Sequence, residues 1–223
     1  MRNTNILQIQ GLSLSYPNKD ILDSANLSME GGQLVSIQGR NGAGKSTLLR
    51  SIAGLDKPSK GAVSINGQSI LALTPLERST RIGALWTDRV RIPGFTLREL
   101  ILMGTFNGIH AQQHIDKEMV VENCMSALNF ADLAESPLDQ LSDGELQKGM
   151  IARALAQQPS FLLLDEPTTF LDYIAKDELM STLKNLCRTS GIGILFSSHD
   201  LGIINTYADR KWELKDRQLL EIE

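Results

Sequence analysis

The sequence has little of what marks membrane-spanning, secreted or nucleic-acid-binding proteins. No window approaches the roughly 18 apolar residues of a membrane-spanning helix, and residues 1–6 lack the apolar stretch of a signal peptide. No long basic run occurs and the formal net charge is −4, so we expect no nucleic-acid partner. We therefore expect a cytoplasmic protein that reaches a membrane, if it does, as a peripheral subunit held by a partner.

Cysteine is also scarce. Cys124 and Cys187 are the only two, and they form no C-x-x-C pattern. The sequence therefore predicts reduced core thiols rather than a disulfide framework or a thiolate metal site. A length of 223 residues with 42% hydrophobic content suits one large domain, or one domain with an inserted subdomain.

One glycine-rich segment carries most of the functional information. Residues 39–47 match the P-loop pattern G-x-x-x-x-G-K-[ST] between an expected strand over 34–38 and an expected helix over 46–53. Glycines let the backbone approach phosphate oxygens, and a helix N-terminus adds unpaired N–H donors and a positive dipole end. The expected nucleotide-binding residues are Gly39, Arg40, Asn41, Gly42, Ala43, Gly44, Lys45, Ser46 and Thr47. Lys45 supplies a cation for the β- and γ-phosphates, and Ser46 supplies a hydroxyl for Mg²⁺.

The remaining pattern predicts an α/β fold. Residues 6–38 are β-rich, residues 88–140 show helical periodicity and no convincing strand, and strands and helices alternate after residue 141. We expect a P-loop NTPase with a mostly parallel core sheet, helices on both of its faces and an antiparallel β subdomain. Its nucleotide-binding core would comprise residues 1–87 and 141–223, with a helical subdomain at 88–140.

Two carboxylates follow a buried strand. The apolar run Phe161–Leu164 ends at Asp165 and Glu166, where the ligand crevice of an open α/β sheet lies. Asp165 can hold Mg²⁺ through water, and Glu166 can orient or deprotonate water at the γ-phosphate. Because adjacent strand residues point in opposite directions, the two carboxylates are expected to have different tasks.

Several further segments resemble the motifs of ABC ATPases. Leu141–Glu145 is similar to their signature motif, usually LSGGQ, and residues 165–168 to their Walker B end. Residues 169–172, ending at Asp172, are similar to the D-loop, and residues 197–200 to the segment with the switch histidine, here His199. Tyr16 stands where the family has an aromatic residue that stacks on adenine. The order and spacing agree from residue 6 to about 215, nearly the whole chain.

The resemblance implies ATP and Mg²⁺ as ligands and a head-to-tail dimer with two ATP sites. Each site would use the P-loop of one subunit and the signature residues Ser142, Asp143, Gly144 and Glu145 of the other. Independently of the family, Ser142-x-x-Glu145 is a helix capping box, which exposes amides and a hydroxyl toward an anion. Asp143 and Glu145 replace the usual Gly and Gln. Both add negative charge near a phosphate, so we expect weaker closure.

A third departure follows the strand expected over 82–86. Thr87 stands where the family has a glutamine that reaches Mg²⁺ and signals to the membrane subunit, and Asp88 comes next. Threonine is too short to span the same gap but can reach the metal through water. We expect this arrangement, while direct use of Asp88 and loss of the metal contact remain alternatives. A metal site at His110 and His114 is not expected, because no third ligand is evident.

The resemblance is strongest to the ATPases of iron-chelate, haem and cobalamin importers, around Arg81–Leu100 and residues 141–148. It implies transmembrane permease subunits as partners and ATP hydrolysis coupled to transport. An exporter ATPase, a soluble ABC ATPase and a nonhydrolytic nucleotide sensor are the alternatives. Only 97 residues separate Lys45 from Ser142, too few for the long coiled coil usual in DNA-maintenance types. The presence of Glu166 and His199 argues against the sensor.

Overall fold

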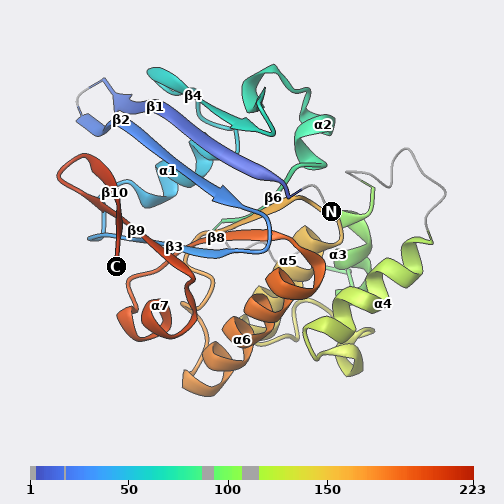
Figure 1. Cartoon of the computed structure of the whole chain (residues 1–223). Helices are drawn as coiled ribbons and strands as arrows, with labels where there is room; N and C mark the ends of the chain where they lie inside the picture. The colour runs from blue at the N-terminus through green and yellow to red at the C-terminus, as the bar shows by residue number, and fades with distance from the viewer. Residues whose placement is uncertain (1–3, 18, 87–92, 107–115) are drawn as a thin grey trace.

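The computed structural model describes residues 4–17, 19–86, 93–106 and 116–223 (Figure 1). Within these ranges two β-sheets lie one above the other, and helices pack between them and below the larger sheet. Thr87, Asp88, His110 and His114 fall outside the described residues, so the expectations for them stay predictions.

The larger sheet is the mostly parallel one that the sequence predicts. Its strand order is β10-β9-β3-β8-β7-β6, and only the β9–β10 pair is antiparallel. The strands are β3 (Leu34–Gln38), β6 (Ile82–Leu85), β7 (Phe161–Leu164), β8 (Gly193–Ser197), β9 (Arg210–Lys215) and β10 (Gln218–Ile222). All four residues of β7 and all five of β8 are buried, because helices or the second sheet cover both faces.

The smaller sheet is antiparallel, with the order β2-β1-β4-β5, as expected. Its strands are β1 (Ile6–Tyr16), β2 (Lys19–Glu30), β4 (Lys60–Ile65) and β5 (Gln68–Ser69). The alternation of apolar residues predicts two short strands, over 6–9 and 12–16, whereas the structure has one long strand in which bulges keep the pairing with β2. The short helices η1 (Ile70–Ala72) and α2 (Pro75–Ser79) were not expected, although Thr74 and Glu77 form a capping box there.

Helices cover both faces of the larger sheet. Helix α1 (Lys45–Ile52) lies between the two sheets and shares one hydrophobic cluster with them, whereas α5 (Asp143–Leu155) and α6 (Tyr173–Ser190) pack on the opposite face. Helix α7 (Leu201–Tyr207) packs against α6. The sequence pattern predicts helices over 46–53, 143–157, 173–189 and 200–207, and the observed helices agree with these bounds within two residues at each end, as is usual for fraying helix termini.

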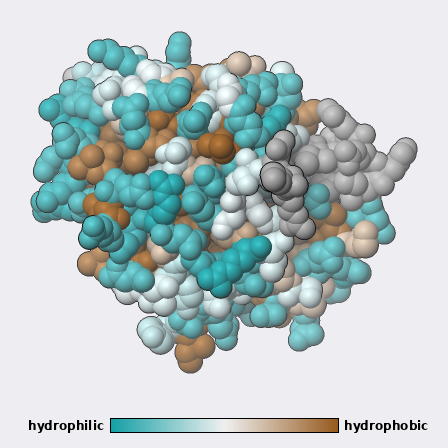
Figure 2. Space-filling model, viewed as in Figure 1, coloured by the Kyte–Doolittle hydropathy of each residue, from teal (hydrophilic) through white to brown (hydrophobic). Residues whose placement is uncertain are grey.

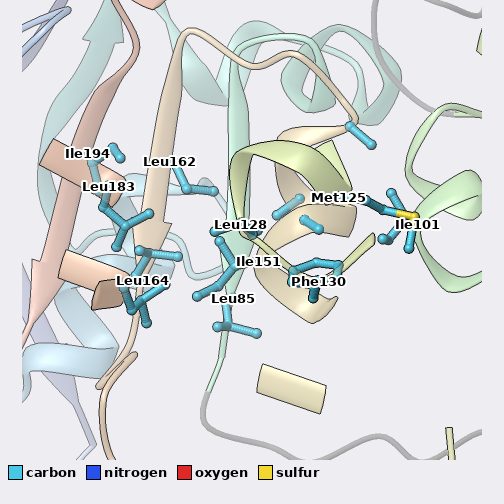
Figure 3. Packing of buried hydrophobic residues seen from close by; sticks show 14 of the residues in the cluster. Leu85, Ile101, Met125, Leu128, Phe130, Ile151, Leu162, Leu164, Leu183 and Ile194 are labelled. Carbon is cyan, nitrogen blue, oxygen red and sulfur yellow. The ribbon is translucent and has the colours of Figure 1, made fainter. Parts of the chain in front are cut away.

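The segment predicted as a helical subdomain contains α3 (Leu97–Gly104), α4 (Lys117–Ala127) and η3 (Ala131–Leu133). Within residues 93–106 and 116–140 an isolated bridge joins Thr96 to Pro137, and no strand is present. Figure 3 shows that the core runs without interruption from Leu164 on the sheet, past Ile151 on α5, to Ile101 and Met125 on the helical segment. The helical segment therefore shares its core with the sheet, and a division into subdomains remains a prediction.

The surface is mixed in character. On the face shown in Figure 2, hydrophilic side chains are spread widely and hydrophobic ones appear between them. Among the described residues, no helix is both long and apolar enough to cross a membrane.

Both cysteines are free thiols. Cys187 is buried and Cys124 is half-buried, and burial raises the pKa of each to about 12 because it penalises the thiolate. They are unreactive core residues, as the sequence predicts.

Close packing of α3 against α5 gives a test of this architecture. A Cβ added at Gly104 would lie 2.1 Å from the Arg153 carbonyl oxygen and 3.0 Å from Ala156 Cβ. We therefore expect Gly104→Ala to push the two helices apart and lower the free energy of unfolding by about 1–3 kcal/mol. Urea denaturation measures this, with exposed Ser126→Ala on α4 as control. Equal stability of the two variants would contradict the packing of α3 on α5.

Candidate functional site

The glycine-rich loop connects β3 to α1 and leaves the helix N-terminus open. No side chain caps α1 and its first turn contains no acidic residue, so its N–H groups and positive dipole end face the loop. Gly44 adopts φ = 109°, and a Cβ there would lie 2.2 Å from Ile21 Cγ2. The glycine pattern is thus required by backbone conformation and by close packing, and together these shape an anion cradle.

Lys45 lies inside this cradle. Its side chain is only 8% exposed, and its Nζ donates to the Gly39 carbonyl at 2.9 Å and lies 3.7 Å from Glu166 Oε1. A desolvated ammonium held at the mouth of an amide-rich loop is a strong attractor for phosphate oxygens.

The two carboxylates after β7 are brought to the same cavity. Asp165 is 4% exposed, and its Oδ1 accepts a hydrogen bond from Ser197 Oγ at 2.7 Å. Glu166 adopts φ = 50°, in the left-handed region. This bend ends the alternation of the strand, so the expectation that the two side chains point in opposite directions does not hold. They nevertheless make different contacts, as predicted.

His199 lies beside Glu166. Its Nδ1 is 3.0 Å from Glu166 Oε2, and its ring is largely exposed. Glu166 therefore lies between Lys45 on one side and His199 on the other, at the C-terminal ends of β7 and β8. The histidine is in position to hold the carboxylate that faces the phosphate cradle.

Lys45, Asp165 and Glu166 line a cavity of about 440 Å³, whereas His199 contacts Glu166 without lining the cavity. The predicted residues in its lining are Tyr16, Asn41, Gly42, Gly44, Lys45, Ser46, Thr47, Asp165 and Glu166. Gly39, Arg40 and Ala43 belong to the same loop without lining the cavity. Tyr16 is 53% exposed at the cavity edge, where its ring has an open face.

Sequence reasoning missed three residues of this region. Lys19 and Ile21 line the cavity, and Lys19 Nζ donates to the Gly42 carbonyl at 3.1 Å. Ser197 links the Asp165 carboxylate to the Glu166 backbone N–H and was noted only as part of the segment with His199. A signal was present in each case: Lys19 and Ile21 follow the turn after Tyr16, and Ser197 is a polar residue that ends a buried strand.

A second cavity, of about 460 Å³, lies near the N-terminal ends of β7 and β8, at the opposite edge of the sheet. Its lining, which includes Asn5, Cys124, Gln158 and Ser160, contains no charged side chain. Without a cation it offers nothing comparable for polyphosphate, so the chemistry assigns the nucleotide to the cavity at the glycine-rich loop.

The signature segment lies outside the cavity of its own chain. Ser142 is the N-cap of α5, its Oγ donates to Glu145 Oε2 at 2.6 Å, and Glu145 N–H donates to Ser142 Oγ at 3.2 Å. The predicted capping box is therefore present. The hydrogen bond from Ser142 lowers the pKa of the Glu145 carboxyl, which stays ionised at neutral pH.

The other signature and D-loop residues are joined by packing. A Cβ at Gly144 would lie 2.7 Å from Leu171 Cδ2, so the start of α5 fits tightly against the segment before Asp172. Asp172 caps α6 by accepting from Ala175 N–H at 2.8 Å. Asp143 lies in the first turn of α5, where a negative charge favours the helix dipole. These are local roles, and the predicted contacts with a second subunit remain predictions.

Comparison with known proteins agrees with this geometry. A family model described as "ABC transporter" matches residues 22–169. An uncharacterised ABC transporter ATP-binding protein of Methanocaldococcus jannaschii is 36% identical over 96% of this chain and 75% of its own length. A petrobactin import ATP-binding protein of Bacillus anthracis is 33% identical over 96% of this chain and 79% of its own length. A dimeric, post-hydrolysis ATP-binding cassette bound to ADP and Pi superposes with a TM-score of 0.84, at 29% identity, over 97% of this chain and 98% of that one.

The cradle predicts a specific dependence on Lys45. We expect Lys45→Ala to weaken binding of a fluorescent ATP analogue at least tenfold, because the variant loses the only lysine held against both Gly39 and Glu166 in the described structure. Hydrolysis should be abolished. Exposed Lys57→Ala is the control for a change of one positive charge. Binding and turnover of Lys45→Ala equal to those of the control would show that the nucleotide binds elsewhere.

Proposed function

The chain belongs to the ABC transporter ATPase family, and on that premise we propose that it powers the import of an iron chelate, haem or cobalamin by hydrolysing ATP in a head-to-tail dimer. The observation that carries the catalytic part is the position of Glu166, within 3.7 Å of Lys45 and 3.0 Å of His199, beside an uncapped helix N-terminus.

The described residues fit ATP. Backbone N–H groups of the loop, the α1 terminus and Lys45 supply positive charge for the β- and γ-phosphates, and Tyr16 supplies an aromatic face for adenine at the cavity edge. The donor set also fits Mg²⁺, which prefers oxygen ligands: Ser46 offers a hydroxyl and Asp165 a carboxylate in the same lining. When bound, Mg²⁺ neutralises charge that develops on the phosphate oxygens. Thr87 is our candidate for a further contact through water.

Lys45, Glu166 and His199 then have separate tasks in the hydrolysis of ATP. The phosphates attract Lys45 away from Glu166, which removes the ion pair that neutralises this carboxylate. Glu166 orients a water and accepts its proton, a task that contributes typically about 10²–10⁴ in rate. His199 fixes the Glu166 carboxylate through Nδ1 and senses the γ-phosphate from the end of β8, at the same edge of the sheet.

A second copy completes the site in this proposal. The signature segment of one chain does not line its own cavity, yet its capped helix presents amides and a serine hydroxyl to solvent. The similarity to a dimeric cassette bound to ADP and Pi supports pairing of this segment with the P-loop of a partner copy.

The direction of transport rests on the relatives. The petrobactin import protein of Bacillus anthracis and a probable siderophore transport protein of Bacillus subtilis, 34% identical over 96% of this chain, support import of an iron chelate over export. We propose that transmembrane permease subunits hold the ATPase on the inner face of the cell membrane. Two experiments test this assignment: co-purification of the chain with the product of a neighbouring permease gene, and measurement of iron-chelate uptake by vesicles that contain the complex. ATP-driven export of the chelate would contradict it.

Replacing Glu166 by glutamine should separate binding from chemistry. Glu166→Gln keeps the shape of the side chain but cannot accept a proton, so we expect turnover to fall about 10²–10⁴-fold while ATP binding survives. Size-exclusion chromatography with Mg-ATP should show accumulated dimer in the presence of the permease. Turnover within twofold of the unaltered protein would remove Glu166 from the base role.

We predict that the negative charge of the Glu145 carboxylate weakens closure of the dimer. Glu145→Gln removes a charge that, in the dimer, would lie near the γ-phosphate, and one such charge at a helix N-terminus is worth about 0.3–1 kcal/mol. We therefore expect the dimer Kd in ATP to fall about two- to fivefold, with a smaller effect at high salt. Sedimentation in a Glu166→Gln background measures it, with exposed Glu122→Gln as the control. An unchanged or weaker dimer would show that Glu145 does not oppose closure.

A further inference from the structure

A buried serine at the end of β8 joins the Asp165 carboxylate to the backbone of Glu166. Ser197 is 0% exposed, and its Oγ accepts a hydrogen bond from Glu166 N–H at 2.9 Å and donates one to Asp165 Oδ1 at 2.7 Å. One hydroxyl therefore fixes a side chain and a backbone amide on neighbouring residues of another strand.

Both contacts act where orientation matters. Asp165 is nearly enclosed, and a hydrogen bond to one of its oxygens sets the rotation of the carboxylate about its final bond. Glu166 adopts the left-handed region at φ = 50°, which a non-glycine residue adopts only where surrounding contacts hold it. Ser197 secures its N–H, and Thr169 Oγ1 donates to its carbonyl oxygen at 3.0 Å. Without this bend Glu166 would continue the strand and point away from the cavity.

We propose that Ser197 is a positioning residue of the ATPase, whose hydroxyl aligns Asp165 for Mg²⁺ and holds the Glu166 backbone in the bend that aims its carboxylate at the phosphate cradle. Ser197 does not line the cavity and touches no reacting atom. It acts through the two carboxylates, and the inference rests on the roles proposed for them above.

The chain offers a matched control for a simple packing role. Ser36 on β3 is also 0% exposed and lies in the same parallel sheet, and its hydroxyl has no hydrogen-bond partner among the described residues. Ser36→Ala removes the same atom from the same kind of environment without breaking a hydrogen bond. Ser197→Thr and Ser197→Val form a second pair, nearly equal in shape, of which only the threonine keeps a hydroxyl.

The first measurement needs no metal or nucleotide. Hydrogen exchange at the Glu166 amide, followed by NMR in the nucleotide-free protein, should be at least tenfold faster in Ser197→Ala than in the unaltered protein, because its acceptor is removed. Ser36→Ala should leave the rate within twofold. Equal exchange in Ser197→Ala and Ser36→Ala would overturn the proposal for the Glu166 backbone.

The second measurement follows the metal directly. Mn²⁺ replaces Mg²⁺, and its Kd in the presence of a nonhydrolysable ATP analogue is measured by electron paramagnetic resonance. Loss of an outer partner of a metal ligand typically costs about 10–100-fold in affinity, so we expect about tenfold weaker binding for Ser197→Ala and Ser197→Val. Ser197→Thr and Ser36→Ala should stay within twofold, as should metal-free binding of the analogue by every variant.

Three results would overturn the inference: unchanged Mn²⁺ affinity in Ser197→Ala, equal affinity for the valine and threonine variants, or an equal loss in Ser36→Ala. If the threonine variant does not fold, the two alanine variants decide. Asp165→Asn separates a failure of the role proposed for Ser197 from a failure of the metal role proposed for Asp165. If it loses Mn²⁺ while Ser197→Ala does not, only the role of Ser197 is wrong. If Asp165→Asn binds Mn²⁺ normally, both the metal role of Asp165 and the inference are wrong.

Discussion

The parallel pairing of β3, β8 and β7 is the constraint on which the site depends. The three strands are neighbours and run in the same direction, so their C-terminal ends meet at one edge of the sheet. The phosphate loop follows β3, the two carboxylates follow β7, and β8 ends at Ser197, two residues before His199. Lys45 and Glu166, 121 residues apart in the chain, thereby come to lie 3.7 Å from each other. Helices α5 and α6 on one face and α1 with the antiparallel sheet on the other exclude water from these strands.

The ion pair between Lys45 and Glu166 stabilises both charges at this edge of the sheet while no nucleotide is bound. Lys45 and Glu166 partly neutralise each other in a poorly solvated place, which lowers the cost of burying either charge. In the proposed mechanism, a polyphosphate competes for the lysine and leaves the glutamate to act on water. At the start of α5 the carboxylate of Glu145 has a different partner: it accepts a hydrogen bond from the Ser142 hydroxyl of the same chain. In the proposed dimer, pairing with a second copy would compete with this local hydrogen bond.

Much of this arrangement could be predicted from the sequence. The continuous apolar run of β7 predicted a buried strand of a mostly parallel sheet, the glycine spacing predicted the loop, and Ser142 with Glu145 predicted a capping box; the structure contains all three. Features that depend on a single backbone bend could not be predicted. The positive φ of Glu166 is unusual for its residue type and changed which way the side chain points. The partners of Ser197 depend on strand register between β7 and β8, which no local pattern encodes. Thr87 lies outside the described residues, and its metal contact stays a prediction.

The central claim is that each ATP site combines the P-loop of one copy with the signature serine of another. Mixing two inactive proteins, Lys45→Ala and Ser142→Arg, tests it most directly. In a mixed dimer one site contains both substitutions and the other contains neither. The account predicts that each protein alone is inactive and that a one-to-one mixture with the permease recovers a fraction of the unaltered ATPase rate. A mixture as inactive as its components, in dimers shown to have formed, would contradict the account, as would normal hydrolysis by Ser142→Arg alone.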